Sequence, residues 1–142
     1  MKSGKFWLAV LVGGVVANVF DGVLHGMILQ KAYYNQLTDL FNAAGNPMWY
    51  ILGDFIFAFV FVWVYDRVYG SFGGGAKGGA TYGMYAGVLL NFPMWILMGM
   101  MFRGFPYALS WIWTITGILY AVIIGAVVGA LYKKGEATQA AS

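Results

Sequence analysis

Apolar residues occur along this 142-residue chain in four long runs, and most of the charged residues lie outside these runs, in the connecting segments and at the two ends of the chain. The runs cover residues 6–29, 48–68, 79–102 and 106–132. A helix needs about 20 apolar residues to cross the hydrocarbon core of a bilayer, and each run meets that length. The pattern therefore predicts an all-α integral membrane protein, folded as one domain over residues 1–142 in an up-down four-helix bundle.

The composition supports a lipid environment. Hydrophobic residues make up 61% of the chain and charged residues 9%, whereas ordinary soluble domains carry about 25% charged residues. There is no cysteine, which excludes disulfides, thiolate metal sites and thiol catalysis. The formal net charge is only +3 and the cations lie mostly near the ends of the runs, so a nucleic-acid partner is not expected.

Lysine and arginine are unevenly divided between the two sides of the predicted bundle. The side of the chain termini holds Lys2, Lys5, Arg67, Lys77, Lys133 and Lys134, whereas the other side holds Lys31 and Arg103. Loops that are rich in Lys and Arg stay on the cytoplasmic side of a membrane. The bias predicts a multi-pass protein of the bacterial inner membrane with both termini in the cytoplasm.

The segments between the runs carry patterns of their own. Helical spacing of apolar residues predicts a short amphipathic helix over about 31–44, lying in the outer interface of the membrane. The segment SFGGGAKGGA at 71–80 is expected to be a flexible hinge, because Lys77 is followed by glycine and not by the Ser or Thr of a phosphate-binding loop. Residues 133–142 are expected to form a disordered tail.

Small residues recur at steps of four in three of the runs. The stripes are Gly14, Asn18, Gly22 and Gly26 in the first run, Gly79, Gly83 and Gly87 in the third, and Gly117, Ala121, Gly125 and Gly129 in the fourth. Small side chains let helix backbones approach closely in lipid, where hydrophobicity does not drive helices together. The stripes predict close packing, either inside this bundle or against other subunits.

Polar residues inside the runs are candidates for a ligand or proton site. Asn18, Asp21 and His25 share one helix face, because they are spaced i, i+3 and i+7. A rise of about 1.5 Å per residue places the other candidates near the same depth in the outer half of the membrane. They are Asp54, Asn91, Ser110 and Thr114. We therefore expect one polar layer that faces the bundle interior or a water-filled pocket.

This layer has three interpretations. It can fasten the helices together, it can bind a proton or cation in a small carrier, since ionisable groups inside a membrane point to function, or it can hold a metal or pigment. The weak metal candidates are Met94, Met98 and His25, because thioethers and imidazole bind copper. No residues have zinc-ligand spacing, and the sequence identifies no cofactor. Pro93 predicts a kink in the third run.

Several motifs give the chain a family likeness. They are GGVVANVFDGVLHGMIL in the first run, AYY directly after it, the glycine-rich loop that opens the third run, and the ending GAVVGALY. With these motifs the chain resembles a broad group of uncharacterised small four-helix bacterial membrane proteins. The resemblance implies the four-helix fold and no particular activity.

The leading functional hypothesis is a non-enzymatic membrane protein that packs through its small-residue stripes, as a homo-oligomer or as an accessory subunit of a larger membrane complex. The alternative is a small proton- or cation-coupled carrier with an intramembrane Asp/His site. A metal- or pigment-binding protein ranks below both. An enzyme is the least favoured class, because the sequence contains no visible set of nucleophile, base and orienting group.

Overall fold

The computed structural model describes residues 3–40 and 46–132, and within these ranges it contains helices and turns but no strand. The prediction of an all-α chain is confirmed, and four of its helical segments are long and apolar enough to cross a membrane. The first segment runs without a break through α1 (Gly4–Val23), the π-helix η1 (Leu24–Leu29) and α2 (Gln30–Ala32). The others are α3 (Met48–Phe72), α4 (Gly75–Met101) and α5 (Tyr107–Leu131).

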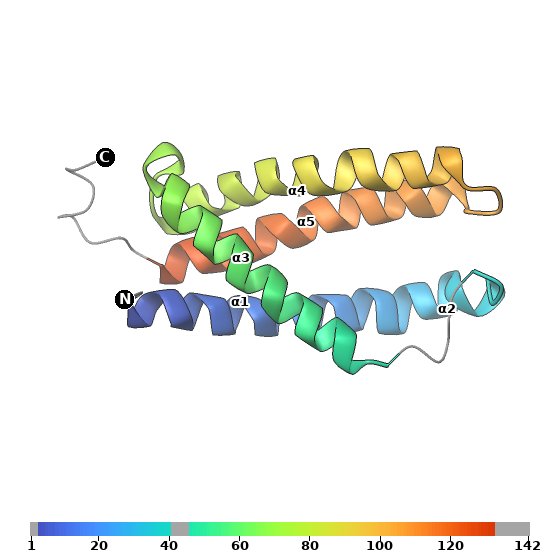
Figure 1. The fold of residues 1–142 in the computed structure, drawn as a ribbon, viewed down its shortest axis with the longest axis horizontal. Coiled ribbons are helices and arrows are strands. Elements are labelled where there is room, and N and C mark those ends of the chain that lie inside the picture. The colour runs from blue at the N-terminus through green and yellow to red at the C-terminus, as the bar shows by residue number, and fades with distance from the viewer. Residues whose placement is uncertain (1–2, 41–45, 133–142) are drawn as a thin grey trace.

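The long helices run alternately up and down (Figure 1). The start of α1, the end of α5 and the turn between α3 and α4 lie together, and we call this the terminal end. The opposite end, with α2 and the connection between α4 and α5, is the loop end. Side chains bond the first backbone N–H groups of α1 and α3: the Ser3 hydroxyl accepts from the Phe6 N–H at 3.3 Å, and Asn46 Oδ1 accepts from the Met48 N–H at 3.0 Å.

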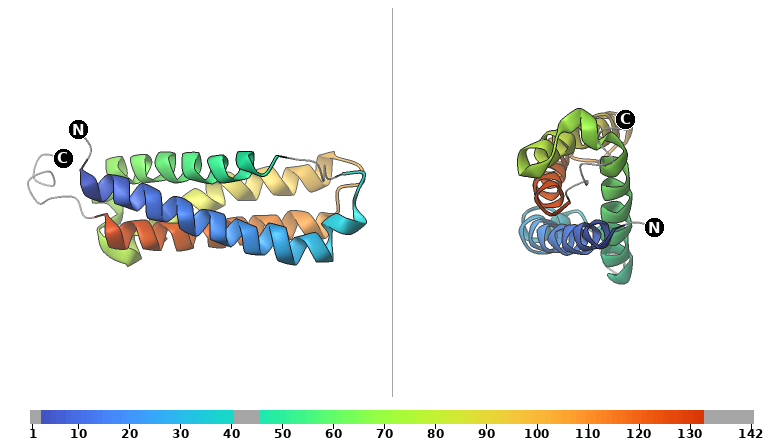
Figure 2. Two further views of the ribbon diagram at one scale, coloured as in Figure 1. Left: turned by 90° about the horizontal axis from the view of Figure 1, so that it is seen from below. Right: turned by 90° about the vertical axis from the view of Figure 1, so that its left-hand side faces the viewer.

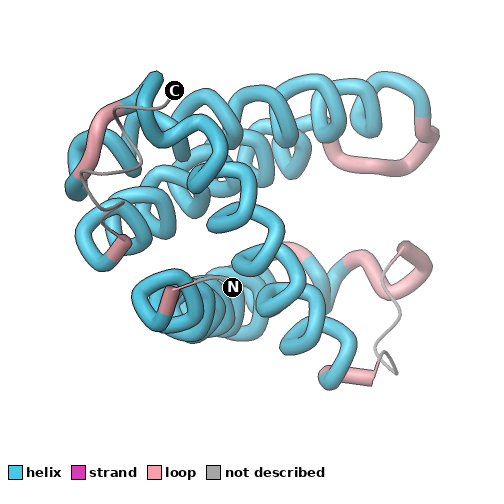
Figure 3. Tube along the Cα trace, turned by 60° about the vertical axis from the view of Figure 1, so that its left-hand side comes forward, coloured by secondary structure: helices cyan, strands magenta, loops and turns pink. Residues whose placement is uncertain are grey.

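The helices do not form a square bundle. α1, α5 and α4 lie in a row, and α3 crosses the row obliquely (Figure 2). Figure 3 shows the same crossing with the terminal end turned toward the viewer. α3 contacts α4 near the terminal end and packs on α1 over much of its length, while α4 and α5 share the most extensive interface. The crossing of α3 over α1 positions the candidate site.

Glycines form the interface between α4 and α5. A Cβ atom added to Gly79 would overlap the backbone oxygen of Gly125, and one added to Gly83 would overlap that of Ala121. Gly125 and Gly129 are equally tight against α4, where they meet the backbone oxygens of Gly79 and Gly75. The small-residue stripes of these two helices therefore pack against each other inside the chain.

The stripe on α1 behaves differently along its length. A Cβ on Gly14 would overlap the ring of Phe55 on α3, so this glycine lets α3 cross closely. Gly22 and Gly26 have no atom within 4 Å of such a Cβ. Gly117 on α5 faces the side chain of Asn91 on α4. Half of the α1 stripe thus packs within the chain and half stays open.

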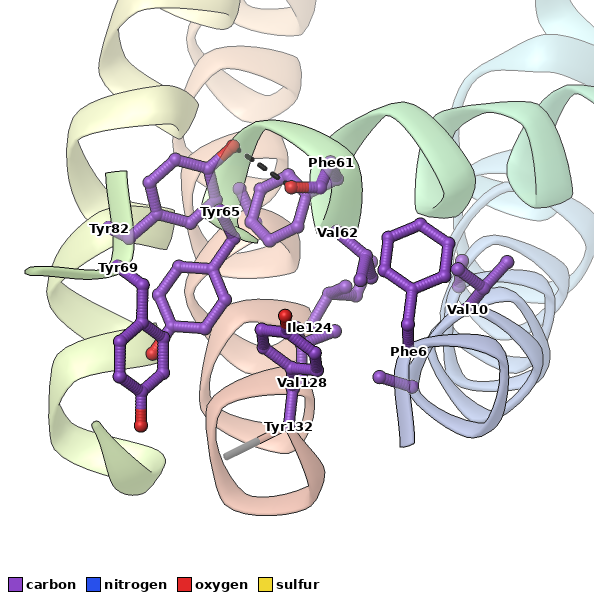
Figure 4. Close-up of a cluster of buried hydrophobic side chains, with 13 residues drawn as sticks. Phe6, Val10, Phe61, Val62, Tyr65, Tyr69, Tyr82, Ile124, Val128 and Tyr132 are labelled. Atoms are coloured by element: carbon purple, nitrogen blue, oxygen red, sulfur yellow. Dashed lines mark hydrogen bonds between the residues drawn. The ribbon is translucent and has the colours of Figure 1, made fainter. Parts of the chain in front are cut away.

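The terminal end is tightly packed around aromatic side chains (Figure 4). Phe6, Val62, Tyr65, Ile124 and Val128 are fully buried there. The buried hydroxyls are satisfied by backbone, because Tyr82 donates to the Phe61 carbonyl and Tyr65 to the Gly73 carbonyl, each at 3.1 Å. Tyr132 donates to the Asp66 carboxylate, which ties the end of α5 to α3.

We expect Tyr132→Phe to lower the free energy of unfolding by about 1–2 kcal/mol, because the Asp66 carboxylate loses a buried hydrogen bond. Unfolding of the purified protein in mixed detergent and dodecyl sulfate measures this change. Tyr85→Phe is the control, since Tyr85 is 66% exposed. Equal stability of the two variants would contradict the expectation.

Two predicted connecting segments differ from the structure. The amphipathic helix over 31–44 is not formed in the described part, because α2 ends at Ala32 and a 3-10 turn η2 (Tyr34–Gln36) follows. Tyr33 breaks the helix with φ −134° and ψ −52°, and residues 41–44 lie outside the described range. The predicted tail, 133–142, also lies outside it.

The glycine-rich hinge is also smaller than predicted. α3 continues to Phe72 and α4 begins at Gly75, so only Gly73 and Gly74 lie between them. Gly73 and Gly75 have φ values of 73° and 77°, which glycine adopts without strain and which make the tight turn possible. The remaining glycines of 71–80 lie in α4, which also continues through Pro93.

Candidate functional site

Two carboxyl groups meet where α3 crosses α1. The side chain of Asp21 on α1 lies within interaction range of the side chain of Asp54 on α3. Asp54 is buried, at 8% exposure. The Tyr120 hydroxyl on α5 donates to its Oδ1 at 3.2 Å. Two carboxyl groups can bond to each other only when one of them holds a proton, because an ionised carboxylate has no donor. The nearness of the two groups in an apolar bundle therefore favours a state in which the pair holds one proton.

Aromatic rings and small residues surround this pair. Tyr120 packs against Phe20 and Phe57, with ring centroids 5.5 and 5.2 Å apart. Ala17 on α1 and Ala58 on α3, each one turn nearer the terminal end, are fully buried. Asn18 donates to the Gly14 carbonyl at 2.9 Å and to the Ile51 carbonyl of α3 at 3.5 Å, so its amide also joins the two helices.

A second polar group lies toward the loop end. His25 Nδ1 and the Tyr34 hydroxyl are 2.5 Å apart, and the indole N–H of Trp113 on α5 donates to the same hydroxyl at 3.0 Å. The two rings of His25 and Tyr34 are stacked. His25 lies in η1, and π-helical turns occur frequently at functional sites because they redirect side chains. This group also lies within electrostatic range of the carboxyl pair. Asp54 interacts with His25, and Asp21 interacts with Tyr34.

The other predicted members of the polar layer lie on α4 and α5, where Asn91 and Thr114 make their hydrogen bonds. Asn91 donates to the Gly87 carbonyl at 2.9 Å and accepts from the Trp95 indole at 3.1 Å. Thr114 donates to the Ser110 carbonyl at 2.8 Å, and the fully buried Ser110 lies against Gly99. The structure therefore divides the predicted layer into the site between α1, α3 and α5 and a separate set of polar residues on α4 and α5.

The structure adds three residues to the predicted site, namely Tyr34, Trp113 and Tyr120. Tyr120 donates to Asp54, Tyr34 bonds to His25, and Trp113 donates to Tyr34. Tyrosine and tryptophan are frequent in this chain, so their identity alone gave no signal. Tyr120 also lies on a different helix face from the predicted residues Ser110 and Thr114, so helical spacing gave no reason to include it.

The site brings together carboxyl, imidazole and phenol groups, all of which can bind or donate a proton. Among the described residues there is no group of three or more His, Cys, Asp or Glu side chains that could hold a metal ion. Met94 is 55% exposed on α4, and His25 is already bonded to Tyr34. Comparisons with protein-family models, curated proteins and solved structures found no match to this chain. The functional argument therefore depends on the residues themselves.

Proposed function

We propose that this protein is a small carrier of the bacterial inner membrane that couples a proton bound between Asp21 and Asp54 to the movement of a cation. The bias of lysine and arginine toward the side of the termini supports cytoplasmic termini. The observation that carries the proposal is the buried carboxyl group of Asp54 beside Asp21 where α3 crosses α1, with the Tyr120 hydroxyl donating to Asp54. It makes the protonation state of the pair part of how these helices fit together.

A shared proton explains why two acids are placed together in such an apolar chain. One ionised carboxylate in a membrane costs several kcal/mol, and two close together would also repel each other. A neutral amide pair would fasten the helices equally well without this cost. Two acids do what amides cannot, because their proton can be exchanged for another cation.

The test of proton binding is infrared spectroscopy of the purified protein. A protonated carboxyl group has a C=O stretching band that carboxylates and amides lack. We expect such a band at neutral pH, and we expect it to disappear in Asp21→Asn and in Asp54→Asn while both variants stay folded. Asp39→Asn, in an exposed turn, is the control and should keep the band. A wild-type spectrum without the band would overturn the proposal.

Coupling is tested in proteoliposomes that enclose a pH-sensitive dye. An inward gradient of sodium, potassium or lithium ions should drive protons out of the lumen when the wild-type protein is present. The Asp21→Asn variant should give no signal with any of these ions. A signal of equal size in both proteins would show that the carboxyl pair is not the coupling site.

The open half of the α1 stripe favours a second candidate function, self-association or attachment to another membrane subunit. Gly22 and Gly26 lie four residues apart on an exposed surface with no neighbouring atom, and such surfaces allow close helix contact. Because the chain lacks cysteine, Gly26→Cys should form a disulfide-linked dimer in native membranes if two copies meet there. Asn35→Cys is the exposed control on η2.

A further inference from the structure

We infer that the carboxyl pair exchanges its proton with the solution at the loop end, through Tyr34 and His25. The inference rests on the proposed function, because it assigns a route to the proton that Asp21 and Asp54 share. Its basis is a difference between the two ends of the molecule and a chain of hydrogen bonds at one of them.

The terminal side of the pair is closed. The side chains between the pair and the terminal end are fully buried at Ala17, Ala58, Val62 and Ile124, and Phe61 is nearly so. Farther along, the hydroxyls of Tyr65 and Tyr82 are each committed to a backbone carbonyl. A proton that came from the terminal end would have to cross this packed layer (Figure 4).

The loop side of the pair is packed less tightly than the terminal side. Residues 48–53 of α3, which precede Asp54, are exposed but mostly apolar and would face lipid, so the polar route on this side consists of His25 and Tyr34. On α1 and η1, Gly22 and Gly26 leave space beside Asp21 and His25, because neither has an atom within 4 Å of an added Cβ. His25 and Tyr34 are only partly buried. They lie between the carboxyl pair and the loop end.

The hydrogen bonds allow a proton to pass along this route. An indole N–H can only donate, so the Tyr34 oxygen accepts from Trp113, and in the His25 tautomer that the relay uses, the Tyr34 hydrogen points at an unprotonated Nδ1. Neutral His25 then carries its hydrogen on Nε2. When the second lone pair of the Tyr34 oxygen takes a proton from water, Tyr34 passes its original hydrogen to Nδ1.

The imidazolium formed in this way releases its Nε2 proton toward the ionised member of the carboxyl pair. One proton has entered from solution and one has reached the carboxylate, so Tyr34 and His25 are again neutral. His25 is left with its hydrogen on Nδ1. The starting tautomer returns when Nδ1 gives this proton to water and Nε2 takes one from water, with no net transfer, and the Tyr34 hydroxyl rotates back. No oxidant or reductant is involved.

Titratable groups from each neighbouring helix surround this relay. Asp21 on α1, Asp54 on α3 and Tyr120 on α5 interact with one another, and Asp54 also acts on His25. Tyr34 is within electrostatic range of Asp21 and of Tyr50 on α3. The negative charge of the pair attracts the imidazolium proton, which favours transfer inward.

The test follows the protonated-carboxyl infrared band after a rapid drop in pH, with the protein in lipid nanodiscs. In Tyr34→Phe and in His25→Ala we expect the band to rise at least about tenfold more slowly than in wild type, with the same final amplitude. Tyr33→Phe is a matched control, because Tyr33 is the adjacent tyrosine and should leave the rate unchanged. Added imidazole should restore the rate of His25→Ala, which it would not do for a structural defect.

The side of entry is tested in sealed vesicles in which the termini face the lumen. Acid added outside should protonate the pair rapidly, and acid generated in the lumen should not. A wild-type rate in Tyr34→Phe, or faster entry from the lumen, would overturn this inference and leave the proposed function intact. Absence of the band from the wild-type protein would overturn both.

Discussion

Replacement of Gly83 by leucine is expected to separate α4 from α5 and to lower the free energy of unfolding by about 3 kcal/mol or more. The position of any Cβ at Gly83 coincides with backbone of Ala121 and Val122, which cannot move aside as a flexible side chain could. Even Gly83→Ala should destabilise the protein. In an unconstrained helix the same change is favourable by about 1 kcal/mol, because alanine is the better helix former.

The effect of Gly83 is measured by unfolding in mixed detergent and dodecyl sulfate, with Gly70→Ala and Gly70→Leu as controls. Gly70 lies in α3 with no atom within 4 Å of an added Cβ, so Gly70→Ala should be neutral or stabilising. If Gly83→Ala were as stable as Gly70→Ala, the close contact of α4 with α5 would be wrong. If Gly83→Leu kept its stability but lost an associated protein, the stripe would serve a partner instead.

The positions of the long helices could be predicted from hydropathy and length, because these quantities decide whether a segment can span a bilayer. The exact ends could not, since glycines at 75–79 pack into α4 and only Gly73 and Gly74 form the turn. The oblique path of α3 was also beyond the sequence pattern. It depends on the ring of Phe55 lying against Gly14, which is a contact between segments far apart in the chain.

The candidate site was predictable only in part, because sequence spacing gives the depth of a residue along a helix but not the direction of its side chain. The helical rise gives the depth of a residue in the membrane, so Asp21 and Asp54 could be placed at one level. Depth does not say which way a side chain points. Asn91 and Thr114 lie in the predicted layer by depth, yet they bond to the carbonyls of Gly87 and Ser110 on their own helices. Tyr34 was missed because the helix ends before Tyr33, so counting residues at helical spacing from His25 does not give the position of Tyr34.

The second large effect is expected when one acid of the pair is replaced by leucine. Asp54→Leu should cost about 3 kcal/mol of unfolding free energy, because Asp21 loses its partner and the Tyr120 hydroxyl loses its acceptor. Asp21→Leu should cost less, since Asp54 keeps the bond from Tyr120. The double variant should cost at least about 1 kcal/mol less than the two single costs added together, since it leaves no acid without its partner.

The matching asparagine variants separate a fastening role from a proton-binding role. In Asp21→Asn the amide can still donate to the Asp54 carboxylate, so most of the stability should be kept while the exchangeable proton is lost. Asp39→Leu is the control for a carboxylate in an exposed turn and should be neutral. A pair that only fastened α1 to α3 would tolerate asparagine with no change in cation-driven proton movement across vesicles. Stability that is retained while this movement disappears is the combination expected of a coupling site.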